Sequence, residues 1–164
     1  MSKKIYENKI FTLVKDEKTN QDFINMKSES VVILAYDSLS NTICMITEHR
    51  PATNSTSMSL PAGKMEQGET VIDAAIREFK EETGYTLKYP RVLHSYYPAS
   101  GYSNEKVNLV IGLFEADQLG ETNLDEDELI YSTETIPVTD FLKLAIPSAT
   151  LIISQYYVRK TIGE

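Results

Sequence analysis

Gly63-Lys64-Met65-Glu66-Gln67-Gly68-Glu69 leads into Thr70-Val71-Ile72-Asp73-Ala74-Ala75-Ile76-Arg77-Glu78-Phe79-Lys80-Glu81-Glu82-Thr83-Gly84-Tyr85, and this run is the most informative part of the chain. Thr70 is a favourable N-cap residue, and Asp73 three residues later completes a capping box. Apolar side chains then recur at helical spacing along one face. Gly84 supplies the left-handed residue that commonly ends a helix. The pattern predicts an amphipathic helix over residues 70–83.

Three glutamates project from about one turn of this predicted helix. Glu78 and Glu82 are four residues apart and share a face, with Glu81 beside them. Like charges this close repel each other, and a hard divalent cation that binds oxygen ligands would relieve the repulsion. Two such ions about 4 Å apart could clamp a phosphate group. The alternative interpretation is a solvated acidic face, which is common on helices.

A tight turn, Pro61-Ala62-Gly63, precedes the helix. Gly63 can adopt backbone angles that are closed to other residues. Such a turn can present backbone carbonyls to a cation, and the carbonyl of Ala62 is the best placed. Arg77 adds a planar cation that can orient a neighbouring carboxylate or a phosphate.

Outward from this helix the chain alternates between strand-like and helix-like patterns. The run 31–36 is apolar throughout, as expected for a strand that is buried on both faces. Residues 51–59 are small and polar and are predicted to form a loop. Thr139 and Ser148 are predicted to cap two further helices near the C-terminus. The other predicted strands are 42–47, 91–97 and 107–114. Strands on both sides of a central helix predict an α/β fold with a mixed sheet between helices.

The first 28 residues form a separate predicted unit. An apolar, β-branched run at 10–14 precedes a turn signal at 16–20, which predicts one or two strands. Because two strands alone are marginally stable in water, we expect this segment to pack on the main body or on a partner chain. The predicted division is an N-terminal β-strand appendage at 1–28 and a main domain at 29–164.

Composition limits the classes of function. The chain has 164 residues and a net charge of -8, which disfavours binding to nucleic acid or to anionic membranes. A small phosphorylated substrate remains compatible if divalent cations neutralise the charge. The sequence contains no apolar run of transmembrane length and no signal-peptide pattern at its start. The single cysteine, Cys44, excludes an internal disulfide, so a reducing cytoplasm is the expected compartment.

The spacing within 63–85 resembles the Nudix box, Gly-x5-Glu-x7-Arg-Glu-apolar-x-Glu-Glu-x-Gly-apolar. All fixed positions are occupied, and a chance match would occur on the order of once in 10^8 starting positions. The resemblance implies an α/β/α sandwich with a mixed sheet. It also implies Mg²⁺-dependent hydrolysis of a nucleoside diphosphate linked to another group, with Mn²⁺ as an alternative cation. The matching residues are Gly63, Glu69, Arg77, Glu78, Glu81, Glu82 and Gly84.

The resemblance also implies roles for individual residues. Glu78 and Glu82 correspond to the main metal ligands, Glu81 assists them, and the Ala62 carbonyl is a further ligand. The supporting residues that hold the loop and orient the glutamates are Gly63, Glu69, Arg77 and Gly84.

Three segments that flank the box are similar to elements of the ADP-ribose pyrophosphatase subfamily. Residues 48–51 are similar to its Gln-Tyr-Arg element, and residues 97–105 are similar to its Tyr-Pro-Ser-Pro-Gly-Phe-Ser-Asp-Glu element. Residues 124–130 are similar to its acidic loop. Two positions depart from the pattern, since Ser100 replaces a proline and Ser59 replaces a glutamate before Leu-Pro-Ala-Gly. The NADH-hydrolysing relatives carry a zinc-binding cysteine set and a tryptophan that this chain lacks.

The subfamily resemblance implies substrate contacts from Arg50, Gly101 and Ser103. It also implies that Glu126 or Glu128 acts as the catalytic base or as a further metal ligand, with Glu81 assisting catalysis, and the sequence does not choose between the two loop glutamates. The acidic loop could instead be a solvated surface, and Arg50 a surface ion-pair partner.

The expected reaction is cleavage of ADP-ribose, or a close ADP-sugar, to AMP and ribose 5-phosphate. The expected assembly is a homodimer. The alternatives are hydrolysis of another nucleotide, such as an oxidised nucleoside triphosphate, and a non-catalytic sensor that binds ADP-ribose without cleaving it.

Overall fold

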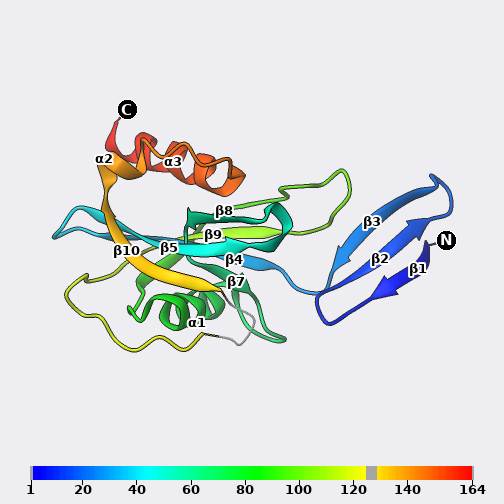
Figure 1. The fold of residues 1–164 in the computed structure, drawn as a ribbon, viewed down its shortest axis with the longest axis horizontal. Coiled ribbons are helices and arrows are strands. Elements are labelled where there is room, and N and C mark those ends of the chain that lie inside the picture. The colour runs from blue at the N-terminus through cyan, green and yellow to red at the C-terminus, as the bar shows by residue number, and fades with distance from the viewer. Residues whose placement is uncertain (1, 125–128, 164) are drawn as a thin grey trace.

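The computed structural model describes residues 2–124 and 129–163, which form two sheets and three α-helices (Figure 1). The N-terminal sheet is an antiparallel meander of β1 (Ser2–Glu7), β2 (Phe11–Asp16) and β3 (Gln21–Met26). The main sheet has the path β10-β5-β4-β9-β8, with β6 paired to β5 and β7 paired to β4. Its strands are β4 (Ser30–Asp37), β5 (Thr42–Arg50), β6 (Ser55–Ser59), β7 (Ala62–Lys64), β8 (Lys88–Tyr96), β9 (Val107–Leu113) and β10 (Ile130–Pro137).

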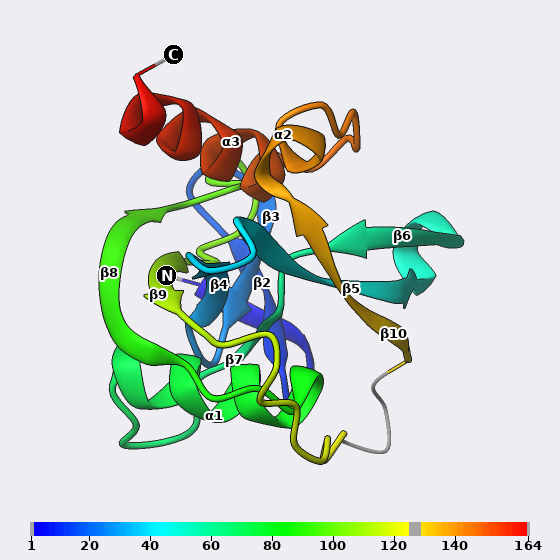
Figure 2. The same ribbon diagram turned by 90° about the vertical axis from the view of Figure 1, so that its left-hand side faces the viewer.

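The main sheet is mixed, as the sequence predicts. β4 runs parallel to β9, whereas the other pairings within the sheet are antiparallel. α1 (Val71–Thr83) covers one face, and α2 (Val138–Phe141) and α3 (Ala149–Ile162) cover the other (Figure 2). The predicted α/β/α sandwich is therefore confirmed.

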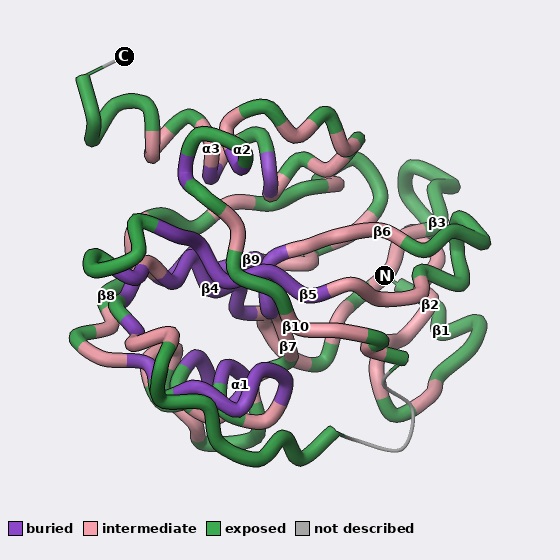
Figure 3. Tube along the Cα trace, turned by 60° about the vertical axis from the view of Figure 1, so that its left-hand side comes forward, coloured by how far each residue is buried: buried purple, intermediate pink, exposed green. Residues whose placement is uncertain are grey.

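Successive side chains of β4 point to opposite faces and enter two different cores. Val31 and Ile33 pack on the α1 side, whereas Val32 and Leu34 pack on the α3 side. Because helices cover both faces, this strand is buried along most of its length (Figure 3). This burial explains its continuous apolar sequence.

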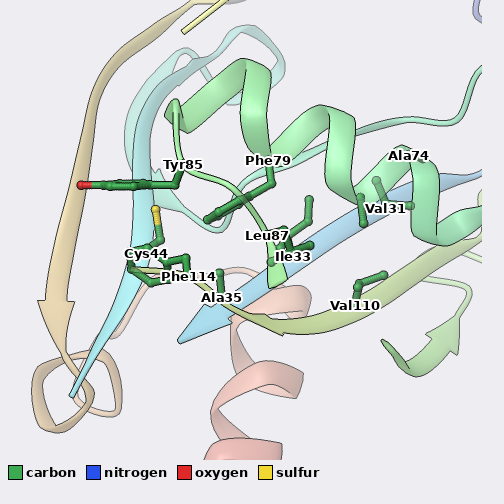
Figure 4. Close-up of a cluster of buried hydrophobic side chains, with 11 residues drawn as sticks. Val31, Ile33, Ala35, Cys44, Ala74, Phe79, Tyr85, Leu87, Val110 and Phe114 are labelled. Atoms are coloured by element: carbon green, nitrogen blue, oxygen red, sulfur yellow. The ribbon is translucent and has the colours of Figure 1, made fainter. Parts of the chain in front are cut away.

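The core beneath α1 is built around three aromatic rings (Figure 4). Phe79 meets Phe114 edge-on with ring centroids 5.9 Å apart, and Tyr85 lies 5.0 Å from the same ring. These rings explain why the apolar positions of the box accept aromatic residues, since Phe114 on the sheet side completes the cluster. The result is a rigid support for the helix that carries the glutamates.

The ends of α1 are as predicted. The Thr70 hydroxyl accepts a hydrogen bond from the Asp73 amide at 3.2 Å, and Gly84 ends the helix with a φ of 75°. Ser148 likewise caps α3 through the Leu151 amide. The prediction for Thr139 is wrong, because α2 begins at Val138 and continues directly from β10.

Residues 51–59 are not only a loop. A 3₁₀ turn, η1 (Pro51–Thr53), leads into β6, which pairs with β5 from Ile46 opposite Ser59 to Arg50 opposite Ser55. Serine and threonine give no apolar alternation to detect here. The hydrogen bonds of the neighbouring strand override the local loop signal.

The N-terminal sheet has three strands instead of the expected one or two, and none of residues 2–26 is buried (Figure 3). Its link to the main domain includes an isolated bridge between Ile24 and Ser103 and the amide hydrogen bond from Ile24 to the Tyr102 carbonyl at 2.7 Å. A sheet without a buried layer depends on such external contacts for its stability. Among the described residues, no helix combines the length and apolar character that crossing a bilayer requires.

Candidate active site

Gly63 allows β7 to approach the side chain of Glu78 closely. A Cβ atom built on Gly63 would lie 1.9 Å from the Glu78 Cδ atom, so any side chain here would collide with the carboxylate. The prediction that Gly63 adopts unusual backbone angles is wrong: the positive-φ glycines among the described residues are Gly68, Gly84 and Gly163. Space, not backbone conformation, requires glycine at position 63.

Glu82 is a buried residue, only 3% exposed, and its carboxylate is held by the same turn. Its Oε2 atom accepts a hydrogen bond from the Ala62 amide at 2.9 Å. Glu78 is 6% exposed and lies one helical turn away on the same face. Two carboxylates are thus buried side by side against β7, and burial of such charges is costly without cationic compensation.

Arg77 supplies part of that compensation and connects the glutamates of the box. Its guanidinium donates to both carboxylate oxygens of Glu69 at 2.9 Å, to Glu81 at 3.0 Å and to the Lys64 carbonyl at 3.0 Å. It also pairs with Glu78 at 2.9 Å. These hydrogen bonds, first those with Glu69, raise the pKa of Arg77, and they hold the pKa of Glu69 below its usual value.

The donor chemistry of this cluster fits a hard divalent cation. Glu78 and Glu82 offer buried carboxylate oxygens, and β7 contributes the backbone around Ala62. Among residues 2–124 and 129–163, no group of three acidic, histidine or cysteine side chains is already gathered around one point. Glu78 and Glu81 both pair with Arg77, whereas Glu82 is held by the Ala62 amide. A cation could be held by Glu78 and Glu82 with Glu81 beside them, and it would then compete with the guanidinium for Glu78 and Glu81.

The predicted substrate residues are placed in two different regions. Arg50 extends from the end of β5, is half exposed and pairs with Glu48. Gly101 and Ser103 belong to the loop between β8 and β9, which is attached to the N-terminal sheet by Ile24 and by hydrogen bonds from Asn104 (Figure 1). The structure thus gathers the box residues but ties the loop of Gly101 and Ser103 to the N-terminal sheet.

Glu126 and Glu128 lie outside the described residues. On one side of them the Asn123 amide donates to the Glu81 carbonyl of α1 at 2.9 Å, and on the other the His49 amide of β5 donates to the Leu129 carbonyl at 3.0 Å.

Glu29 is a residue near the site that the sequence analysis missed. Its carbonyl accepts a hydrogen bond from the Met65 amide at 2.9 Å, so the start of β4 braces the loop between β7 and α1. The Glu29 carboxylate is itself held by Asn108 at 2.8 Å and by Lys106. Asn108 is buried, and a single asparagine inside the apolar run 107–114 is the signal that could have revealed this brace.

Comparison with known families identifies the class of protein. The model described as the NUDIX domain matches residues 26–155, which is most of the chain, and the chain therefore belongs to this family. The resemblance seen in residues 63–85 is confirmed. Members of this family generally use a divalent metal ion.

Two curated relatives are similar to this chain over more than half of its length. The ADP-ribose pyrophosphatase of Bacillus subtilis (strain 168) is 35% identical over 106 residues, which cover 62% of this chain and 55% of the relative. The methanol dehydrogenase activator of Bacillus methanolicus is 29% identical over 124 residues, covering 74% of this chain and 62% of the relative. The chain thus spans a little over half the length of these curated relatives.

A solved structure shares the architecture. It is described as the crystal structure of an ADP compounds hydrolase and superposes with a TM-score of 0.79, covering 99% of this chain and 92% of that chain. At 21% identity, this likeness shows the fold alone.

Proposed function

We propose that this protein is a metal-dependent pyrophosphohydrolase that cleaves ADP-ribose, or a close ADP-sugar, to AMP and ribose 5-phosphate. The observation that carries the proposal is the pair of buried carboxylates, Glu78 and Glu82, packed against β7 with Arg77 alongside. Two buried carboxylates side by side do not stabilise the fold on their own, but they can bind a hard divalent cation. The similarity to ADP-ribose pyrophosphatases supports the choice of substrate.

The residues of the chain divide the work of hydrolysis. Glu78 and Glu82 would hold the cation, with Glu81 and the Ala62 carbonyl as further ligands. Such a divalent ion, Mg²⁺ or alternatively Mn²⁺, would offset charge on the diphosphate and lower the pKa of a bound water. Glu126 or Glu128 takes the proton of the attacking water, since a carboxylate can act as a general base when it lies within hydrogen-bond reach. Arg50 binds a phosphate oxygen of the diphosphate.

The remaining contacts come from the loop between β8 and β9. Gly101 and Ser103 contact the substrate, and their attachment to the N-terminal sheet fixes where that loop lies. Gly63, Glu69, Arg77 and Gly84 shape the turn and the helix end that present the glutamates.

Release of AMP from ADP-ribose, with and without Mg²⁺, tests the proposal. The panel includes ADP-glucose, NADH, diadenosine phosphates and oxidised dGTP at equal concentration. We expect Mg²⁺-dependent AMP release with ADP-ribose as the preferred substrate. Preference for oxidised dGTP would make the protein a hydrolase of another nucleotide, and binding of ADP-ribose without release of AMP would make it a sensor. Either result would contradict the proposal.

The N-terminal unit, residues 1–28, is proposed as the contact of a homodimer and residues 29–164 as the Nudix domain. The exposed side chains of Ile5 and Tyr6 in β1 support this division, because a thin sheet gains stability when a second copy covers it. Cys44 is a buried free thiol, which supports a reducing compartment, the cytoplasm.

A further inference from the structure

A small polar group lies at the end of β5 and β6, on the face of the sheet that α1 covers. Side chains of a strand alternate between faces, so Cys44, Glu48 and Arg50 share one side of β5. Cys44 belongs to the core beneath α1, and both burial and the nearby charge of Glu82 raise the pKa of its thiol. Glu48 and Arg50 therefore continue the face that carries the catalytic glutamates.

Glu48 is the centre of this group. Its Oε1 atom accepts a hydrogen bond from the hydroxyl of Ser59 and pairs with the Arg50 Nη2 atom at 2.6 Å. The Glu48 side chain is 15% exposed, whereas that of Arg50 is 52% exposed. The carboxylate is thus seated on the sheet, and the guanidinium projects beyond it toward solvent.

The position of Ser59 connects this group to the metal-ligand cluster. Ser59 lies opposite Ile46 in the pairing of β6 with β5, diagonal to Glu48. Only Leu60 and Pro61 separate it from Ala62, whose amide binds the Glu82 carboxylate. The strand that fixes Glu48 therefore continues directly into the turn that fixes Glu82.

We propose that Glu48 is a positioning residue for substrate binding: it holds the Arg50 guanidinium in place to contact the diphosphate of a nucleoside diphosphate, and Ser59 fixes the carboxylate that does so. This inference rests on the proposed function. A guanidinium held at one side by a carboxylate keeps its other N–H donors directed outward for a phosphate oxygen. Preorganising a long, exposed side chain also reduces the entropy that binding must remove.

The contact between Glu48 and Ser59 allows the acid to be exchanged between the two strands. This chain carries the acid on β5 and the small polar residue on β6. Because the two side chains touch, either arrangement leaves one carboxylate across the strand pair.

The first test measures kcat and KM for ADP-ribose with saturating Mg²⁺. We expect E48A to raise KM about tenfold and E48Q about fivefold, with kcat within about twofold of wild type, because a contact made equally in ground and transition states affects binding. In an R50A background, E48A should cause no further loss, because Glu48 acts through Arg50.

The second test moves the carboxylate across the strand pair from position 48 to position 59. E48Q/S59E should bring KM to within about twofold of wild type, since the glutamate at position 59 replaces the missing partner of Arg50. E115Q is the matched control: it removes the acid of another close ion pair, Lys88 with Glu115 at 2.5 Å, near the opposite edge of the sheet. Its KM should not change. Thermal unfolding of every variant checks that the fold is intact.

The outcomes separate the inference from the proposed function. If wild type releases no AMP from ADP-ribose, both fail together. If wild type is active but E48A leaves KM unchanged, or if the losses of E48A and R50A multiply, the inference alone is overturned. A loss of kcat and of thermal stability without rescue by E48Q/S59E also overturns it, because that pattern describes a merely structural glutamate.

Discussion

At the scale of single residues, the carboxylates of the box are arranged around the guanidinium of Arg77. Arg77 pairs with three glutamates, yet Glu82 is held by a backbone amide instead. The side chain that is most deeply buried is therefore the one that Arg77 compensates least directly. The Ala62 amide thus fixes one oxygen of the Glu82 carboxylate beside the turn.

Glu82→Gln should lower turnover of ADP-ribose by about 100-fold or more, because a ligand oxygen of the cation is replaced by an amide. The glutamine carbonyl can still accept the Ala62 hydrogen bond, so the fold should be unaffected. Initial rates across a Mg²⁺ titration, with circular dichroism of the folded variant, measure the effect. Normal Mg²⁺-dependent turnover by the variant would remove Glu82 from the ligand set.

Arg77→Met should destabilise the protein by about 3 kcal/mol at neutral pH, because it leaves partly buried carboxylates without their cation. The pKa of Glu69 is lowered in the folded state, so its stabilising contribution is present above its ordinary value of 4.5 and is lost as pH falls through the lower folded value. The deficit of the variant should therefore shrink below about pH 4.5. Urea unfolding of both proteins at pH 7 and pH 4 measures it, and a deficit that is the same at both pH values would contradict the ion-pair account.

At the scale of elements, the sequence predicts well what local rules decide. The boundaries of α1 follow from Thr70 and Gly84, and the buried strand β4 follows from its apolar run. β6 could not be predicted, because only its pairing with β5 makes a strand of a segment that is mostly serine and threonine. The clustering of Glu78, Glu82 and Arg77 was readable from spacing, whereas the brace at Glu29 depends on contacts with residues about 79 positions away in the sequence.

Gly63→Ala should separate β7 from α1. The new methyl group would overlap the Glu78 carboxylate, and relief of that overlap requires the glutamate or the turn to shift. We expect a loss of about 1–3 kcal/mol in unfolding free energy, as is typical of overpacking. Gly101→Ala is the stability control, since a Cβ there meets nothing within 4 Å. Equal stability of the two variants in urea would show that the close approach is not required.

At the scale of the whole molecule, the N-terminal sheet stands beside the sandwich instead of inside it (Figure 1). Its half-buried β2 and exposed β1 leave apolar side chains at the surface, including Ile5 and Tyr6. Sequence composition indicated the weakness of this unit, but the third strand and the bridge from Ile24 to Ser103 emerge only from tertiary contacts.

A homodimer is expected in sedimentation velocity at micromolar concentration. Ile5→Lys together with Tyr6→Lys should shift the protein to monomer, because charge replaces apolar contact area on β1. Leu39→Lys is the control: Leu39 is also an exposed apolar side chain, but it lies in the turn after β4. A monomeric wild type would contradict the dimer proposal, and a dimer that survives the double substitution would exclude β1 as its contact.

The parallel pairing of β4 with β9 has a consequence for how the protein is made. Ser30 of β4 pairs with Val107 of β9, and α1 lies between them in the sequence. During synthesis α1 emerges after β4 but before β9. The helix that carries the glutamates is therefore complete before the second of these two strands exists. Long-range closure of this kind slows folding. The acidic centre on α1 therefore reaches its native packing only after β9 has been synthesised.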